Sequence, residues 1–337
     1  MEGRLLATAA QVKALVESHT AGDDAKFRAA LTEVLDSAGR KGDRAREVED
    51  LRALLDTRRS AARPQSPPPP AAPTAVVQPR GELAQVLTVS LPRTTLADLA
   101  LGSDVMARLH RVLTEQRHAD VLRARGFQPL RKLLLTGPSG TGKSMTAEVL
   151  AAELAVPVFT ARLDAFADLP ADDAVAQLSL VFDLMAQSRA VCLFDDVDAL
   201  IDPDGGERSR SRLRDVLRAF TGFLDADASA GVLVVTTNRP QLLDRPLLRR
   251  FDTVVDYPLP STGVVQEVVL RRLRGFDLSA VEWPRVASTA SGLSHEQVSA
   301  AATLAAKQCI LDGAAQVETG ALLAALRERR QMLKMAP

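Results

Sequence analysis

The sequence is poor in the residues that build disulfide frameworks, metal clusters and aromatic binding surfaces. It has 2 cysteines, 4 histidines, 1 tryptophan and 1 tyrosine in 337 residues. Two cysteines are too few for a disulfide framework, so we expect a reduced, cytoplasmic protein. The histidines, at positions 19, 110, 118 and 295, are too scattered for a metal cluster, and we expect each at the surface or at the edge of a core.

Long apolar runs and an excess of one charge are also missing. No stretch approaches the roughly 18 apolar residues that a membrane span needs, and the N-terminus, with Glu2 and Arg4, lacks a signal-peptide core. Lys plus Arg equals Asp plus Glu at 42 each, which leaves no net charge to attract a membrane or a nucleic acid. We therefore predict neither as a partner. The hydrophobic content of 46% is sufficient for a sizeable core.

The composition changes along the chain and predicts four parts. Residues 1–60 carry three short amphipathic patterns, which predict a helical bundle that is either an adaptor for a partner or an oligomer cap. Residues 61–80, with consecutive prolines at 67–70, predict a semi-rigid linker. Strands and helices alternate over 81–260, and helices alone are expected over 261–337, as a lid.

A glycine-rich segment stands between an apolar strand at 132–136 and a helix at 145–154. It consists of Gly137, Pro138, Ser139, Gly140, Thr141, Gly142, Lys143 and Ser144, with Met145 following. Strand, glycine loop and helix form the context of a phosphate-binding P-loop, in which backbone N–H groups hold phosphate oxygens. Lys143 would reach the β- and γ-phosphates and Ser144 would bind Mg²⁺. The alternative is a plain glycine turn, but the flanking pattern favours a nucleoside triphosphate site.

The expected strands are apolar along their whole length. They are 132–136, 156–160, 191–194, 231–236 and 254–257. Strands without a polar face, separated by helices, indicate a parallel sheet covered on both faces. The predicted fold class is α/β: a P-loop NTPase parallel sheet with helices on both faces, a C-terminal helical lid and a small N-terminal all-α module.

Polar residues follow two of these strands at the edge where the phosphate loop lies. Asp195 ends the strand at 191–194 and is placed to hold the Mg²⁺ shell, and Asp196 is placed to polarise the attacking water. Asn238 ends the next strand and can bond both the γ-phosphate and that water. Each also has a structural alternative, since Asp often caps a helix and Asn often forms a turn.

These motifs resemble the AAA+ ATPases, and within them the AAA subgroup proper. The resemblance covers about residues 81–313 and rests on the loop at 137–144, the strand with its carboxylates at 191–196, Asn238, and the segment 243–252. It implies binding of ATP with Mg²⁺ and ATP hydrolysis.

The segment 243–252 carries a further implication of the resemblance. Arg249 and Arg250 match the two positions whose arginines, in the family, reach the nucleotide bound by the neighbouring subunit. Such catalysis requires a homo-oligomer, typically a hexameric ring in this family. The alternative is a solvated basic end of a helix.

Weaker features resemble other parts of the family. The stretch 95–99 resembles the segment that contacts the base, and 291–294 lies where the family has a turn near the adenine. The start at 80–83 and the single ATPase module resemble bacterial AAA ATPases that are often paired with a subtilisin-like protease. A protein client, with such a protease as one candidate, is therefore an implied partner.

Two departures from the family pattern leave two functions open. Asp196 stands where the family usually has Glu, and one methylene fewer withdraws the carboxylate by about 1.5 Å. The loop at 164–173 has Phe166 as its only aromatic, so it should hold a polypeptide poorly. The preferred function is an oligomeric ATP-hydrolysing remodeller or regulator of a protein partner. The alternative is a slowly hydrolysing, ATP-dependent switch or scaffold. A DNA-acting role has only the arginine run at 208–212 in its favour.

Overall fold

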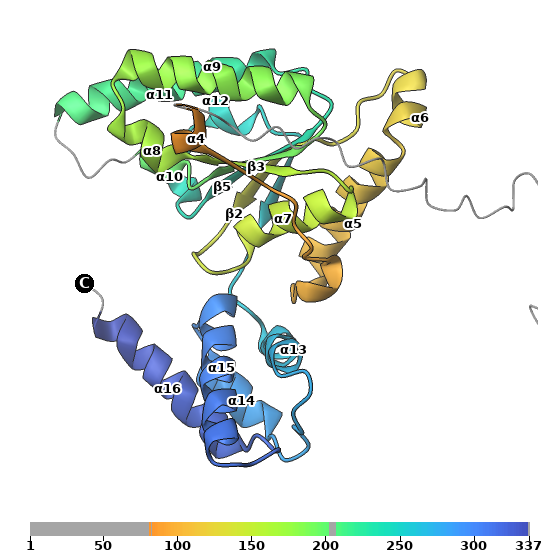
Figure 1. Ribbon diagram of the computed structural model, residues 1–337, viewed down its shortest axis with the longest axis vertical. Coiled ribbons are helices and arrows are strands. Elements are labelled where there is room, and N and C mark those ends of the chain that lie inside the picture. Colours follow the sequence, from red (N-terminus) through yellow and green to blue (C-terminus); the bar gives the residue numbers. More distant parts are fainter. Residues whose placement is uncertain (1–80, 82, 202–206, 336–337) are drawn as a thin grey trace, which may run out of the picture. The chain divides into compact units, whose positions relative to one another are not determined.

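The computed structural model describes residues 81, 83–201 and 207–335, all within the compact unit Pro73–Pro337. The helical bundle predicted at 1–60 and the linker predicted at 61–80 lie outside the described residues. The described elements form a sheet with its covering helices, followed by a group of C-terminal helices (Figure 1).

A six-stranded sheet in the order β1-β3-β4-β5-β2-β6 organises the described part of the chain. The strands are β1 (Leu87–Ser90), β2 (Lys132–Thr136), β3 (Val158–Arg162), β4 (Val191–Asp195), β5 (Val232–Thr237) and β6 (Thr253–Asp256). The strands β2 to β6 pair in parallel, which confirms the predicted sheet. An additional strand, β1, pairs antiparallel with β3 at one edge.

Helices cover both faces of this sheet, as predicted. Successive strand residues point to opposite sides, so apolar strands present an apolar surface on each face for helices to cover. On one face, Leu134 and Phe194 are fully buried in a core shared with α9 (Ala171–Gln187) and α11 (Glu207–Ala226). On the other face, Leu133 lies in a second core with α5 (Ser103–Arg117) and α7 (Lys143–Glu153). Figure 1 shows α9 and α11 on one side of the strands and α5 and α7 on the other.

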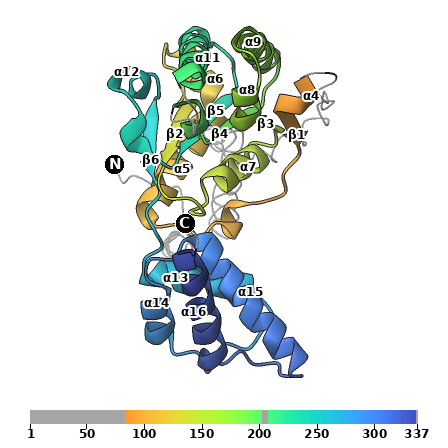
Figure 2. The ribbon, with the colours of Figure 1, turned by 90° about the vertical axis from the view of Figure 1, so that its left-hand side faces the viewer.

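The chain after β6 is helical, and its helices share a core of their own. They are α13 (Thr262–Arg272), α14 (Trp283–Ala290), α15 (His295–Leu311) and α16 (Thr319–Met335). Val269, Val286 and Leu326 are at most 1% exposed in this core. Figure 2 shows the four helices as one bundle.

Short elements complete the described chain. They are α4 (Leu83–Val86), η1 (Leu96–Asp98), α6 (Ala119–Ala124), α8 (Leu163–Asp168), α10 (Asp198–Ile201), η2 (Pro240–Leu242) and α12 (Arg245–Leu248). Of these, α10 follows the carboxyl end of β4 and η2 follows the carboxyl end of β5, each shortly after the predicted site residues.

Candidate active site

The predicted phosphate loop joins the end of β2 to the start of α7. At Gly137, where φ is +134°, a Cβ atom would lie 2.2 Å from the carbonyl oxygen of Tyr257. At Gly140, where φ is +74°, it would lie 2.6 Å from the Ser294 hydroxyl oxygen. Both positions therefore require glycine. The loop ends at the N-terminus of α7, where free N–H groups and the helix dipole favour an anion.

Lys143 is the first residue of α7, at the end of this loop, and is only 5% exposed. Its Nζ donates to the carbonyl oxygens of Gly137 at 2.8 Å and Pro138 at 2.9 Å, and to Asn238 Oδ1 at 2.7 Å. Burial lowers the pKa of Lys143, and the nearby carboxylates, first that of Asp196, act in the opposite direction. The ammonium group is thus a desolvated positive charge at the mouth of the loop, where its attraction for phosphate is strong.

Ser144 and Asp195, the two residues predicted to hold Mg²⁺, are in direct contact. The Ser144 hydroxyl lies 2.8 Å from Asp195 Oδ1 and 2.9 Å from Oδ2. Thr236 on the adjacent strand also donates to Asp195 Oδ1, at 2.6 Å, and accepts from the backbone N–H of Asp196 at 2.8 Å. A hydroxyl and a carboxylate are hard oxygen donors of the kind Mg²⁺ uses together with water and substrate phosphates, so these residues fit the ion.

Asp196 and Asn238 face each other across the ends of β4 and β5. Asn238 Nδ2 donates to Asp196 Oδ1 at 2.6 Å, while Asn238 Oδ1 accepts from Lys143. Burial and the neighbouring Asp195 carboxylate raise the pKa of Asp196, and Lys143 opposes them. The backbone of Asp196 has φ of +52°, a conformation that is strained for a non-glycine residue and is common at functional sites.

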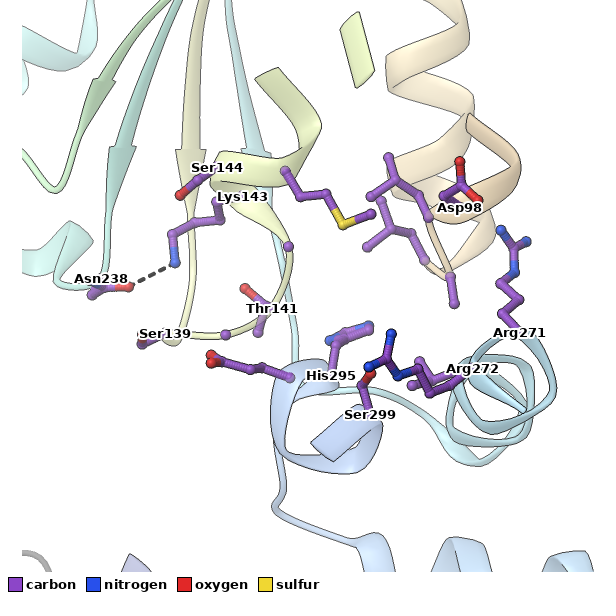
Figure 3. A pocket seen from close by; sticks show the side chains of 18 of the residues that line it. Asp98, Ser139, Thr141, Lys143, Ser144, Asn238, Arg271, Arg272, His295 and Ser299 are labelled. Carbon is purple, nitrogen blue, oxygen red and sulfur yellow. Dashed lines mark hydrogen bonds between the residues drawn. The ribbon is translucent and has the colours of Figure 1, made fainter. Parts of the chain in front are cut away.

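A cavity of about 580 Å³ extends from the phosphate loop to the C-terminal helices. Figure 3 shows Lys143, Ser144 and Asn238 at one end of it and Asp98, Arg271 and Arg272 at the other. Of the segment expected to contact the base, Asp98 and Leu99 line the cavity. The volume suits a nucleotide, with the cationic phosphate loop at one end and a mixture of apolar and charged side chains, among them Leu99 and Arg271, at the other.

The turn predicted to lie near the adenine, at 291–294, directly precedes α15. Positions 291–294 are not among the residues that line the cavity; His295, Glu296 and Ser299, at the start of α15, line it instead. Ser294 forms the N-cap of α15 by accepting from the Gln297 N–H at 3.4 Å, which directs the next residues toward the phosphate loop. The backbone N–H of Glu296 donates to the Gly140 carbonyl at 3.0 Å.

His295 is a cavity residue that the sequence did not single out, since we expected every histidine at a surface or a core edge. Burial lowers its pKa, and a hydrogen bond with the backbone of Ala100 opposes this shift. Its position could be anticipated only from the capping pattern Ser294-His295-Glu296-Gln297, which marks the start of a helix but not what that helix faces.

The structure brings most of the predicted site residues together, but not all. Ser139, Gly140, Thr141, Gly142, Lys143, Ser144, Met145, Asp196 and Asn238 line the cavity. Gly137, Pro138, Asp195, Arg249 and Arg250 are described but are not in its lining. Two lining residues contact three of these: Lys143 donates to the carbonyl oxygens of Gly137 and Pro138, and Ser144 donates to Asp195.

The two predicted arginine fingers are not in the cavity of their own chain. Arg250 forms an ion pair with Asp225 of α11, with Nη2 and Oδ2 2.9 Å apart, and it also donates to the Pro246 carbonyl. Arg249, directly after α12, is exposed. Neither arginine is therefore among the residues that line the cavity of its own chain.

Phe166, the only aromatic residue of the loop expected at 164–173, is 0% exposed. It belongs to the core beneath α9, together with Ala174 and Leu178. A side chain in this position is unavailable to hold a polypeptide, which agrees with the weak threading loop expected from the sequence.

Two kinds of feature are absent from the described residues. No helix among them has the length and apolarity to cross a membrane. They also contain no group of three or more His, Cys, Asp or Glu side chains arranged to hold a metal ion. The Ser144–Asp195 pair thus differs from a site in which protein ligands alone enclose the metal.

The geometry of the site and the similarity to known proteins indicate the same class of protein. A sheet with a phosphate loop, an acidic strand end and a polar strand end defines the class of P-loop ATPases. Residues 133–259 match the sequence profile of the ATPase family associated with various cellular activities (AAA). Residues 133–259 therefore form an AAA-family ATPase domain, the kind of domain that hydrolyses ATP.

Several relatives show the extent of the similarity. The uncharacterized AAA family ATPase y4kL of Sinorhizobium fredii is 27% identical over 331 residues, which are 97% of this chain and 98% of that protein. The ATP-dependent zinc metalloprotease FtsH 1 of Symbiobacterium thermophilum is 34% identical over 223 residues, but these are 63% of this chain and only 37% of that protein. A crystal structure of the FIGL-1 AAA domain has a TM-score of 0.59 at 21% identity, with 72% of this chain and 85% of that chain covered.

Proposed function

We propose that this protein is an ATP-binding and ATP-hydrolysing AAA ATPase whose oligomer remodels or regulates a protein partner. The observation that carries the proposal is the convergence of Lys143, Asp196 and Asn238 through hydrogen bonds of 2.6 and 2.7 Å at one edge of the sheet. Its oligomeric form, its partner and a cytoplasmic location are part of the proposal, as is a division into large subdomain (81–260) and lid (261–337).

The roles of the residues follow from their contacts. Residues 137–145 would hold the triphosphate, with Lys143 opposite its β- and γ-phosphates, and Ser144 and Asp195 would hold Mg²⁺. When bound, the ion would neutralise charge on the phosphates. Asp196 would orient and polarise the attacking water. Asn238, which already bonds Lys143 and Asp196, would hold that water and the γ-phosphate in line.

The arginines are proposed to complete the site of a neighbouring copy. Arg249 is exposed and would be free to meet the nucleotide of another chain, whereas Arg250 beside it would exchange its ion pair with Asp225 for that phosphate. A homo-oligomeric ring, hexameric by resemblance, provides that arrangement.

The names of relatives support a protein partner, and the position of Phe166 limits how such a partner could be handled. The buried Phe166 argues against threading of a polypeptide, so the partner would be regulated or rearranged rather than pulled through a pore. The FtsH relatives are named ATP-dependent zinc metalloproteases, and this chain spans little more than a third of one of them. A separate protease, such as the subtilisin-like one implied by resemblance, is one candidate partner.

The alternative function is a slow switch that binds ATP, assembles and holds a partner. It is favoured by Asp196, whose short side chain keeps its carboxylate further from the water that it would polarise. A displacement of about 1 Å can cost on the order of 100-fold in rate.

A mixing experiment tests the proposal. Lys143→Ala should abolish ATP binding in calorimetry, because it removes the buried cation of the loop. Arg249→Ala and Arg250→Ala should bind ATP normally but lose most turnover. Mixing either arginine variant with Lys143→Ala should restore part of the turnover, because each then supplies what the other lacks.

The control is Arg285→Ala, which removes an exposed arginine of the lid that pairs with Glu282. It should turn over ATP like the wild type. Absence of rescue at every mixing ratio would contradict action between copies, and normal ATP binding by Lys143→Ala would overturn the assignment of the loop.

A further inference from the structure

Asp198 is a third carboxylate near the site, and it does not line the cavity. It begins α10, two residues after Asp196, and its side chain points to the end of β5. Its Oδ2 accepts the backbone N–H of Asn238 at 2.7 Å, and its Oδ1 accepts the Thr237 hydroxyl at 2.5 Å. One carboxylate thus binds two consecutive residues where β5 ends.

Thr237 extends this attachment on both sides. Its hydroxyl oxygen accepts the backbone N–H of Arg239 at 3.0 Å, and its carbonyl oxygen accepts the backbone N–H of Gly137 at 3.3 Å. The backbone on either side of Asn238 is therefore held by Asp198 directly and through Thr237. Bonds to a charged acceptor are the stronger kind, at roughly twice a neutral bond.

The side chain of Asn238 depends on this fixed backbone. Its amide has only one acceptor oxygen, which faces the Lys143 ammonium, and its NH₂ group faces the Asp196 carboxylate. Lysine can only donate and an ionised aspartate can only accept, so a single orientation of the amide satisfies both. A small movement of the backbone would break one of these bonds.

We propose that Asp198 is the positioning residue for Asn238: it fixes the end of β5 so that the Asn238 amide bridges Lys143 and Asp196. This inference rests on the proposed function, in which Asn238 acts in hydrolysis. Asp198 itself contacts neither the cavity nor the reacting atoms.

The test is a double-mutant cycle on ATP turnover by the full-length protein. Asp198→Asn would remove the negative charge and leave only one acceptor oxygen for two donors, the Asn238 N–H and the Thr237 hydroxyl, so kcat should fall about 10- to 100-fold with little change in KM. Asn238→Ala should lose a similar amount. The double variant should be no slower than Asn238→Ala alone, because residues that act through one another are not additive.

Two further variants separate positioning from a loss of folding. Thr237→Val, which replaces the hydroxyl by a methyl group, should reproduce part of the loss in kcat. Thr237→Ser, which keeps the hydroxyl, should have a kcat close to that of the wild type. Asp215→Asn, at an exposed position of α11, is the control for loss of a carboxylate and should leave kcat unchanged. Losses that multiply in the double variant would overturn the proposal, as would an Asp198→Asn variant with wild-type kcat.

A crystal structure of Asp198→Asn provides a readout independent of turnover. We expect the Asn238 amide to have left Lys143 or Asp196. An Asn238 amide that still bridges Lys143 and Asp196 in the variant would overturn the positioning role, whether or not the wild type hydrolyses ATP. Absence of turnover in the wild type would contradict the proposed function, but it would leave the positioning role of Asp198 untouched.

Discussion

Gly137 shows how one residue can be fixed by the backbone of a distant element. Its Cα is so close to the end of β6 that an added Cβ would lie 2.2 Å from the Tyr257 carbonyl oxygen and 3.0 Å from its carbonyl carbon. Tyr257 cannot easily yield, because its hydroxyl bonds Thr146 of α7 at 2.8 Å in the core and its backbone N–H bonds Thr136.

Gly137→Ala should therefore destabilise the protein by at least about 1–3 kcal/mol from backbone strain, before the clash is counted. ATP binding should weaken with it. Chemical denaturation and calorimetry measure the two effects. Gly222→Ala is the matched control, because this glycine lies in α11 with nothing within 4 Å of its Cβ position. There the same change should stabilise the protein by about 0.5–1 kcal/mol.

The site residues that could be predicted from sequence are those with a fixed spacing. Lys143 and Ser144 belong to one continuous loop, and Asp195 ends an apolar strand, so their chemistry follows from local pattern. Thr236 and His295 could not be found in this way. Thr236 is 0% exposed in a strand and acts only because β5 lies beside β4. His295 reaches the cavity only because α15 begins against Gly140.

At the scale of elements, an ion pair holds the start of β2 to the segment after α11. Arg131 Nη1 and Asp227 Oδ2 are 2.5 Å apart, and the side chains are 13% and 2% exposed. Arg131 also bonds the Asp227 carbonyl and the Ser229 hydroxyl. Burial alone would raise the pKa of Asp227, but hydrogen bonds from Ser229 and Arg131 outweigh it and lower that pKa.

Asp227→Ala should destabilise the protein by about 3–5 kcal/mol, because it leaves the buried Arg131 guanidinium without its counter-ion. The folded-state pKa is lowered, so this stabilisation is present above about pH 4 and is lost as the pH falls through the lowered value. Denaturation at pH 7 and in acid should show a difference from the wild type that shrinks in acid. A constant difference would contradict the ionic role.

The exposed pair Arg111–Glu115, in which Arg111 is 72% exposed, is the control for this experiment. Arg111→Ala should change the free energy of unfolding by less than about 0.5 kcal/mol at either pH, because water screens the charges of such pairs.

Elements were predictable where burial leaves a pattern in the sequence. The five parallel strands each contain a run of apolar residues and the long helices have a clear periodicity, so they were found to within a few residues. The strand β1 was missed because its four residues, Leu87–Ser90, alternate apolar and polar and so lack the continuous apolar run that marked the other strands. The short helices α10 and α12 are set by caps and tertiary contacts rather than by a repeat.

At the scale of the whole molecule, hydrolysis is proposed to need more than one copy. The cavity of a single chain contains the phosphate loop, Asp196 and Asn238, but Arg249 and Arg250 lie outside its lining. The sequence could suggest this division only by resemblance, because nothing in the spacing of the two arginines says which chain they serve. The order of the strands, which places Asn238 beside Asp196, could likewise not be predicted from local patterns in the sequence.

The measurement that tests this most directly is ATP turnover per chain over a range of protein concentrations, for the wild type and for Asp196→Glu. We expect turnover per chain to rise steeply with concentration, because assembly supplies the arginines, and to change modestly in the variant. Near-zero turnover that Asp196→Glu restores would instead support the switch that holds ATP. Turnover per chain that stays constant from dilute to concentrated protein would contradict a site completed by a neighbouring copy.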